Sequence, residues 1–154
     1  MPDIIITDTS CLITLTNIGE LALLNKVYGK IITTQQVAEE YGDNLPNWIQ
    51  IEEPKNKDFY LSLLSSIGKG ESSAIALALE KRNCILILDD HKARKIASKY
   101  NLKFIGTLGV LLLCETKGII SSIEPLIDKL NKTSFRVSEK VIEDILKNSK
   151  KNKK

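Results

Sequence analysis

The sequence is poor in aromatic residues, which make up 5% of its 154 residues, and it contains a single histidine. Few aromatics argue against a base-stacking surface of the kind found in RNA-recognition sheets and OB-folds. No apolar run approaches the roughly twenty residues that a membrane-spanning helix needs, and no basic leader precedes a long apolar core. These absences predict a soluble, cytoplasmic protein that makes no membrane contact.

Cysteine is also scarce, because only Cys11, Cys84 and Cys114 are present. Their number is odd, they lie far apart, and each is embedded in an apolar run. This pattern excludes a disulfide framework and a zinc set. We expect three buried, reduced side chains that pack as small hydrophobic groups.

The net charge of +3 comes from one end of the chain. Five lysines stand within the last eight residues, so the remainder carries a net charge of about −2. We therefore divide the chain into one domain, residues 1–146, and a lysine-rich tail, residues 147–154. The tail is expected to be disordered, and either to add weak affinity for nucleic acid or to be merely solvated.

Two apolar runs that end in carboxylates organise the chain. Residues 84–88 are rich in Ile and Leu, which is typical of a strand buried on both faces, and they stop at Asp89 and Asp90. Residues 4–7 likewise run into Asp8, before a helix for which Ser10 is a plausible N-cap. Because ligands bind at the carboxyl ends of parallel strands, we expect these carboxylates to meet at one edge.

The rest of the chain alternates between strand and helix patterns. Further strands are expected at 30–33 and 103–105, with an ambiguous edge segment at 46–51. Helices are expected at 35–41, 59–64, 71–81, 108–116, 123–130 and 139–146. The helix at 108–116 is apolar nearly all round, so we expect it to be buried. This order predicts an α/β fold, a three-layer α/β/α sandwich with a mainly parallel sheet of four to five strands.

Two glutamates join the candidate site. Glu40 shares a helical face with Val37, whereas Glu39 aligns with Gln35, so Glu40 should point inward and Glu39 outward. Glu71 lies in the first turn of its helix, on a stripe of small and apolar residues. The plain alternative for Glu40 is a solvated side chain, and that for Glu71 is a carboxylate that compensates the helix dipole.

Several converging carboxylates cannot all stay ionised without a compensating charge. A hard divalent cation with oxygen ligands, Mg²⁺ or Mn²⁺, supplies that charge, whereas the chain has no histidine or cysteine set for zinc. Such an ion can orient a water molecule and neutralise charge on a phosphodiester. The expected chemistry is phosphodiester hydrolysis.

Five motifs in order resemble those of the PIN-domain ribonucleases, most closely a prokaryotic branch related to the VapC-type toxins of toxin–antitoxin modules. They are IITDTS at 5–10, VAEE at 37–40, GESSAIALA at 70–78, LILDD at 86–90 and IGTLGVL at 105–111. Each motif is weak alone, but five at suitable spacing are strong. The chain departs from the broader pattern at Leu88, Glu71 and His91, the last of which loses a permanent charge.

The resemblance implies a metal-binding and catalytic acidic set consisting of Asp8, Glu40, Glu71, Asp89 and Asp90. It also implies substrate-binding roles for Ser10 and Thr107, and the cations Lys92 and Arg94 stand beside the acidic pair. The function implied is that of an Mg²⁺- or Mn²⁺-dependent endoribonuclease acting on single-stranded or structured RNA. A small antitoxin and a homodimer are the implied partners.

Other classes remain to be weighed. A haloacid-dehalogenase-type phosphatase needs a second Asp at the position of Ser10, and a response-regulator receiver has its acids in the reverse order. The serious alternative is a PIN fold that binds RNA or a protein without cleaving. Metal-dependent RNA cleavage separates the two.

Overall fold

Five short runs of mostly apolar residues form one sheet in the computed structural model, which describes residues 4–135 and residue 143. All pairings are parallel, in the order β3-β2-β1-β4-β5. The strands are β1 (Ile4–Thr7), β2 (Ile31–Thr33), β3 (Ile49–Ile51), β4 (Cys84–Ile87) and β5 (Lys103–Ile105). The central position of β1 places Asp8 next to the end of β4.

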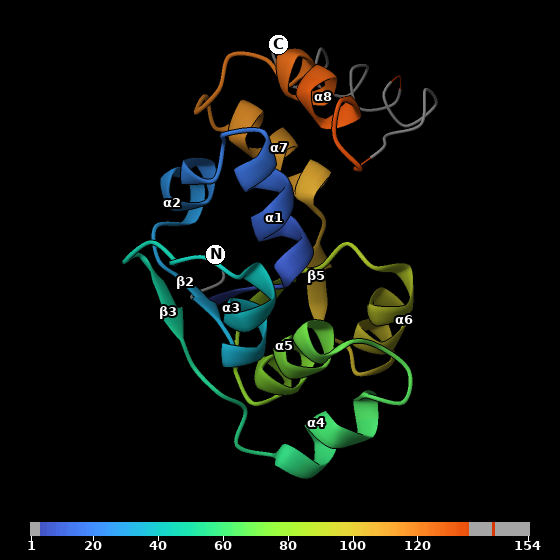
Figure 1. Ribbon diagram of the computed structural model, residues 1–154. Helices are drawn as coiled ribbons and strands as arrows, with labels where there is room; N and C mark the ends of the chain where they lie inside the picture. Colours follow the sequence, from blue (N-terminus) through green and yellow to red (C-terminus); the bar gives the residue numbers. More distant parts are fainter. Residues whose placement is uncertain (1–3, 136–142, 144–154) are drawn as a thin grey trace.

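Helices cover both faces of this sheet (Figure 1). They are α1 (Thr9–Asn17), α2 (Ala22–Tyr28), α3 (Gln35–Tyr41), α4 (Lys57–Leu63), α5 (Lys69–Leu79), α6 (His91–Lys99), α7 (Thr107–Thr116) and α8 (Glu124–Asn131). Strand side chains alternate between two cores: Ile5 and Ile87 pack with α1, α2, α7 and α8, whereas Ile6 and Leu86 pack with α4, α5 and α6. The predicted three-layer sandwich is therefore confirmed. No helix in residues 4–135 is both long and apolar enough to cross a bilayer.

The element predictions hold with a few corrections. Residues 46–51 contain the edge strand β3, and all three cysteines are buried and free. The expected N-cap at Ser10 is wrong, because the Asp8 carboxylate accepts a hydrogen bond from the N–H of Cys11 and starts α1 two residues earlier. Helix α5 likewise begins at Lys69 rather than at Glu71.

Helix α7 is only partly buried, although its sequence is apolar nearly all round. Val110, Leu111 and Cys114 are buried, but Leu108 and Leu112 remain half-buried. Its composition could not show this, because periodicity is lost when nearly every position is apolar. The predicted helix at 139–146 and the lysine tail at 147–154 lie outside the residues that the structure describes, apart from residue 143.

Candidate active site

Pairing of β1 with β4 brings two of the candidate carboxylates together. The register runs from Ile4 opposite Cys84 to Thr7 opposite Ile87, so both chains leave the sheet side by side. The N–H of Asp8 donates to the Ile87 carbonyl over 3.1 Å, and the N–H of Asp89 donates to Oδ2 of Asp8 over 3.3 Å. Asp8 and Asp89 therefore meet at the carboxyl edge of the sheet, as expected.

Asp8 is the most deeply buried of the five acids, with only 1% of its surface exposed. The pKa of its carboxyl is raised to about 7, chiefly by burial and also by the charges of Asp89 and Glu71. Hydrogen bonds from the N–H groups of Cys11 and Asp89 act in the opposite direction. Near neutral pH this carboxyl is thus protonated in a large fraction of the molecules, and a nearby cation would displace that proton.

Asp89 is held by the turn that joins β5 to α7. Its Oδ1 accepts the N–H of Thr107 over 2.8 Å, and its Oδ2 accepts the Thr107 hydroxyl over 2.5 Å. Gly106 allows this close approach, because a Cβ there would lie 3.0 Å from Oδ1 of Asp89 and would collide with Arg94. Thr107 is fully buried and acts as a partner of Asp89.

Glu40 reaches the site from the last turn of α3, a helix that contacts both α1 and α5. The Thr9 hydroxyl donates to Oε1 of Glu40 over 2.7 Å, and a Cβ on Gly70 would overlap the same oxygen. Glu39 instead accepts from the Gln35 amide, on a different face. Glu40 thus points toward Thr9 and Gly70, on a different face from Glu39, although both glutamates are exposed.

Glu71 lies in the first turn of α5, and Asp90 is the N-cap of α6. Oε2 of Glu71 accepts the N–H of Gly68 over 2.9 Å, and Oδ2 of Asp90 accepts the N–H of Ala93 over 2.9 Å. The pKa of the half-buried Glu71 is raised, first by burial and then by the charges of Asp90 and Glu40. Both acids thus accept a backbone N–H at the start of a helix while also belonging to the acidic group, and for Glu71 this is the role that the plain alternative predicted.

The five carboxylates interact electrostatically as one group. Asp8 is affected by Asp89 and Glu71, and Glu71 by Asp90 and Glu40. The ion pairs found among the described residues are Lys57–Glu53, Lys81–Glu52 and Lys129–Glu20, so none neutralises this group. Within residues 4–135 no three acidic, thiol or imidazole side chains are close enough together to ligate one ion directly. A Mg²⁺ ion that keeps several waters needs only one or two carboxylates, and this oxygen-only set fits it.

The predicted substrate-binding residues do not form one cluster. Arg94 lies close to the site: its Nε donates to the Leu88 carbonyl over 2.7 Å, and it lines a hollow together with Asp89. Ser10 is half-buried in the first turn of α1, and Lys92 is exposed on α6. Their roles stay predictions.

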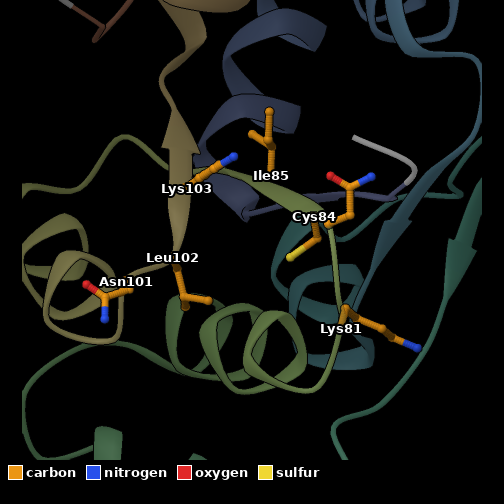
Figure 2. A pocket seen from close by; sticks show the side chains of 7 residues that line it. Lys81, Cys84, Ile85, Asn101, Leu102 and Lys103 are labelled. Carbon is orange, nitrogen blue, oxygen red and sulfur yellow. The ribbon is translucent and has the colours of Figure 1, made fainter. Parts of the chain in front are cut away.

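A hollow of about 320 Å³ lies at the opposite end of the sheet (Figure 2). It is bordered by the residues that enter β4 and β5, among them Lys81, Cys84, Asn101 and Lys103. Lys81 is paired with Glu52. None of the five acids borders this hollow, so it does not belong to the acidic site.

Comparison with known proteins identifies the family. Residues 4–151 match the model of a family described as DUF3368, PIN domain. The chain belongs to the PIN-domain family. PIN domains are in general nucleases that use divalent metals. No curated protein and no solved structure shows significant similarity to the chain.

Three residues at the site of this PIN domain escaped the sequence analysis. Thr9 binds Glu40, and Gly70 and Gly106 make room for Glu40 and Asp89. A glycine or a hydroxyl residue directly after a strand or at the start of a helix is a signal that another side chain comes close to the backbone there. Every acid in question stands next to one of these positions in space, which only the fold reveals.

Proposed function

We propose that this PIN domain is a metal-dependent endoribonuclease that hydrolyses phosphodiester bonds of single-stranded or structured RNA. The main support is the buried Asp8, whose carboxyl is coupled to Asp89 and Glu71 with no described cation paired to any of the three. Asp8 and Asp89 would hold Mg²⁺ or Mn²⁺, with Glu40, Glu71 and Asp90 contributing through the ion's waters. Such an ion orients an attacking water and neutralises phosphate charge.

The chain's own residues fix the ligands in place. Thr107 binds both oxygens of Asp89, the N–H of Cys11 binds Asp8, and Thr9 binds Glu40. Partners of this kind hold a carboxylate in one orientation, and removing them typically lowers metal affinity or activity by about 10- to 100-fold. These threonines are positioning residues in the proposal.

The experiment is RNA cleavage by the purified full chain with Mn²⁺, with Mg²⁺ or with EDTA. We expect cleavage that EDTA abolishes and that Asp8→Asn reduces by about 100-fold or more. Asp58→Asn is the matched control, because Asp58 is an exposed acid in the first turn of α4, outside the acidic group. Cleavage that persists in EDTA, or that is unchanged in Asp8→Asn, would contradict the proposal.

A finer part of the proposal is a toxin-like role in a toxin–antitoxin pair, held inactive by a small antitoxin and working as a homodimer. Its support is the resemblance of the five motifs to those of VapC-type toxins, together with an acidic site that lacks a paired cation among the described residues and would attract a cationic segment. Expression of the chain in bacteria should arrest growth, and Asp8→Asn should not. Unimpaired growth with active, soluble wild-type protein would remove the toxin role and leave the nuclease.

One observation favours a second candidate, a PIN fold that binds RNA or a protein without cleaving. Both oxygens of Asp89 already accept from Thr107, and no three described ligands meet directly. RNA binding that is unchanged by EDTA, without cleavage in Mn²⁺ or Mg²⁺, would establish this candidate.

A further inference from the structure

Two hollows on either side of Arg94 continue outward from the acidic site. The inner hollow, of about 480 Å³, is lined by Asp89, Arg94, Leu108, Leu112 and Phe135. The outer hollow, of about 350 Å³, is lined by His91, Arg94, Lys95, Ser98 and Phe104. Because Arg94 lines both, we treat them as one feature, the Arg94 groove.

Arg94 is fixed where the two hollows meet. Its Nε donates to the Leu88 carbonyl over 2.7 Å, and its guanidinium carbon lies 5.2 Å from the centre of the Phe104 ring. Gly106 leaves room for the guanidinium, since a Cβ at that position would collide with Nη2. A guanidinium has five N–H donors, so a single bond to Leu88 leaves donors for a ligand.

The inner hollow has an apolar wall. Leu108 and Leu112 of α7 pack against the edge of the core and remain half-buried, so part of each side chain faces the hollow. Phe135 is placed by its N–H, which donates to the Thr133 hydroxyl over 3.1 Å. The volume falls within the range of small-ligand sites, which are mostly apolar with a few polar groups.

The outer hollow has a different character. Lys95 and Arg94 are permanent cations, Ser98 offers a hydroxyl, and no carboxylate lines this part of the groove. An apolar hollow next to the acids, followed by a cationic one, matches the order of base and phosphate along a nucleic acid strand. A protein segment would need no such alternation.

We propose that the Arg94 groove is the nucleotide subsite of the acidic site. In this proposal, which rests on the proposed ribonuclease function, the scissile phosphate lies at Asp8 and Asp89. The base of the adjoining nucleotide packs against Leu112 and Phe135 in the inner hollow. The next phosphate binds Arg94 and Lys95, so the substrate is single-stranded at this point, since a paired base could not enter the hollow.

Two matched pairs of variants test the groove. Lys95→Glu and Lys99→Glu change the same charge on exposed positions of α6, but only Lys95 lines the groove. Leu112→Gln and Leu61→Gln make the same polar change on helices, but Leu61 lies on α4 and is 57% exposed outside the groove. Melting temperatures of all four verify that the variants are folded.

The measurement is fluorescence anisotropy of a fluorescein-labelled, random-sequence 10-mer oligoribonucleotide with Mg²⁺, in an Asp8→Asn background so that the probe stays intact. Lys95→Glu should weaken binding about tenfold and reduce the slope against log salt by about 0.7 or more. Leu112→Gln should weaken binding about fivefold or more, through lost base contact. Lys99→Glu and Leu61→Gln should change binding less than about twofold, as exposed positions outside an interface do.

If the two variants of each pair weakened RNA binding equally, the proposal that the Arg94 groove is a nucleotide subsite would be wrong. It would also be wrong if Leu112→Gln left RNA binding unchanged while altering self-association on size-exclusion chromatography, which would make the groove a protein contact. RNA cleavage by the otherwise unmodified chain is measured in parallel. If that cleavage persists while the pairs show no difference, only the groove proposal fails; absence of both cleavage and binding refutes the proposed function as well.

Discussion

At the scale of single residues, the carboxylates of this PIN domain serve two purposes. Asp8, Glu71 and Asp90 each accept a backbone N–H at the start of a helix, and they also form the acidic group. Replacing them with alanine would remove a cap together with a candidate ligand. An amide keeps an acceptor oxygen for the cap and loses only the charge, so Asn and Gln variants are the informative ones.

Glu40 and Glu39 offer a matched test on neighbouring positions. Glu40 accepts from Thr9, whereas Glu39 accepts from Gln35 on another face. Glu40→Gln should lower RNA cleavage by about 10- to 100-fold, and Glu39→Gln should leave it unchanged. The readout is the initial rate of cleavage in Mn²⁺. Similar losses in both variants would contradict the assignment of Glu40 to the site.

Asp8 should make the metal-free protein less stable as pH rises. Its pKa is about 7 in the folded chain, against a usual value of 3.8, so the folded state holds a proton that the unfolded state releases. The stability from this group is full below pH 3.8 and is lost between that pH and about 7, an effect of a few kcal/mol. Asp8→Asn should lack this decline.

Urea denaturation in EDTA at pH 5 and pH 8 measures the effect. The free energy of unfolding of Asp8→Asn relative to wild type should rise between the two pH values, because only the wild type acquires a buried charge. The other carboxylates are common to both proteins and cancel in the comparison. If the wild type and Asp8→Asn showed the same pH dependence, the pKa of Asp8 would not be raised in the folded protein.

At the scale of secondary structure, the starts of four helices (α1, α5, α6 and α7) and the end of α3 converge on one edge of the sheet. Helix α3 is anchored there because the Thr34 and Ser73 hydroxyls hydrogen-bond over 2.6 Å, and the Ser73 hydroxyl donates to the Gly70 carbonyl. These contacts join the start of α3 to α5. The position of Glu40, at the other end of α3, depends on this packing.

Gly70→Ala tests that packing directly. A Cβ at residue 70 would overlap Oε1 of Glu40 and lie 2.7 Å from the Thr9 hydroxyl, so the Thr9–Glu40 bond must give way. Alanine favours helix over glycine by up to about 1 kcal/mol. This gain offsets the cost of moving the Glu40 side chain, so the melting temperature should change little. Cleavage should fall about tenfold, as for the loss of a ligand's partner. Unchanged cleavage would show that the Thr9–Glu40 contact has no role.

The sequence predicts the elements far better than it predicts the details of the site. Apolar runs identify the strands at 84–88 and 4–7, and parallel pairing then places Asp8 and Asp89 together. The helical spacing of α3 places Glu40 and Glu39 on different faces. That spacing does not predict how exposed Glu40 is, because exposure depends on how α3 packs in the folded protein. The contacts of Thr107 and Gly106 with Asp89 come from the turn that joins β5 to α7, and the local sequence gives no sign that this turn lies beside the end of β4.

At the scale of the whole molecule, the acidic group should link metal binding to stability. An ion that binds only the folded chain raises the free energy of unfolding by about 1.4 kcal/mol at ten times its Kd, or roughly 3–6 °C in Tm. Millimolar Mn²⁺ or Mg²⁺ should therefore raise the Tm of wild type relative to EDTA, as followed by circular dichroism.

Asp8→Asn is the control for this shift, since it removes the buried carboxylate whose pKa is raised by burial and by the neighbouring acids. The rise in Tm should disappear in that variant, whereas Asp58→Asn on the remote α4 should keep it. A rise of the same size in Asp8→Asn would place the ion elsewhere on the molecule. Isothermal titration that detects no divalent binding at millimolar metal would remove the metal site altogether.

The strand order has a consequence for the time at which the site comes into existence. Asp8 lies 81 residues from Asp89, its partner across β1 and β4, and Asp89 is completed by Thr107, a further 18 residues along. During synthesis, N-terminal segments emerge and begin to fold first. A nascent chain therefore carries isolated carboxylates and no assembled centre until the fifth strand has emerged from the ribosome.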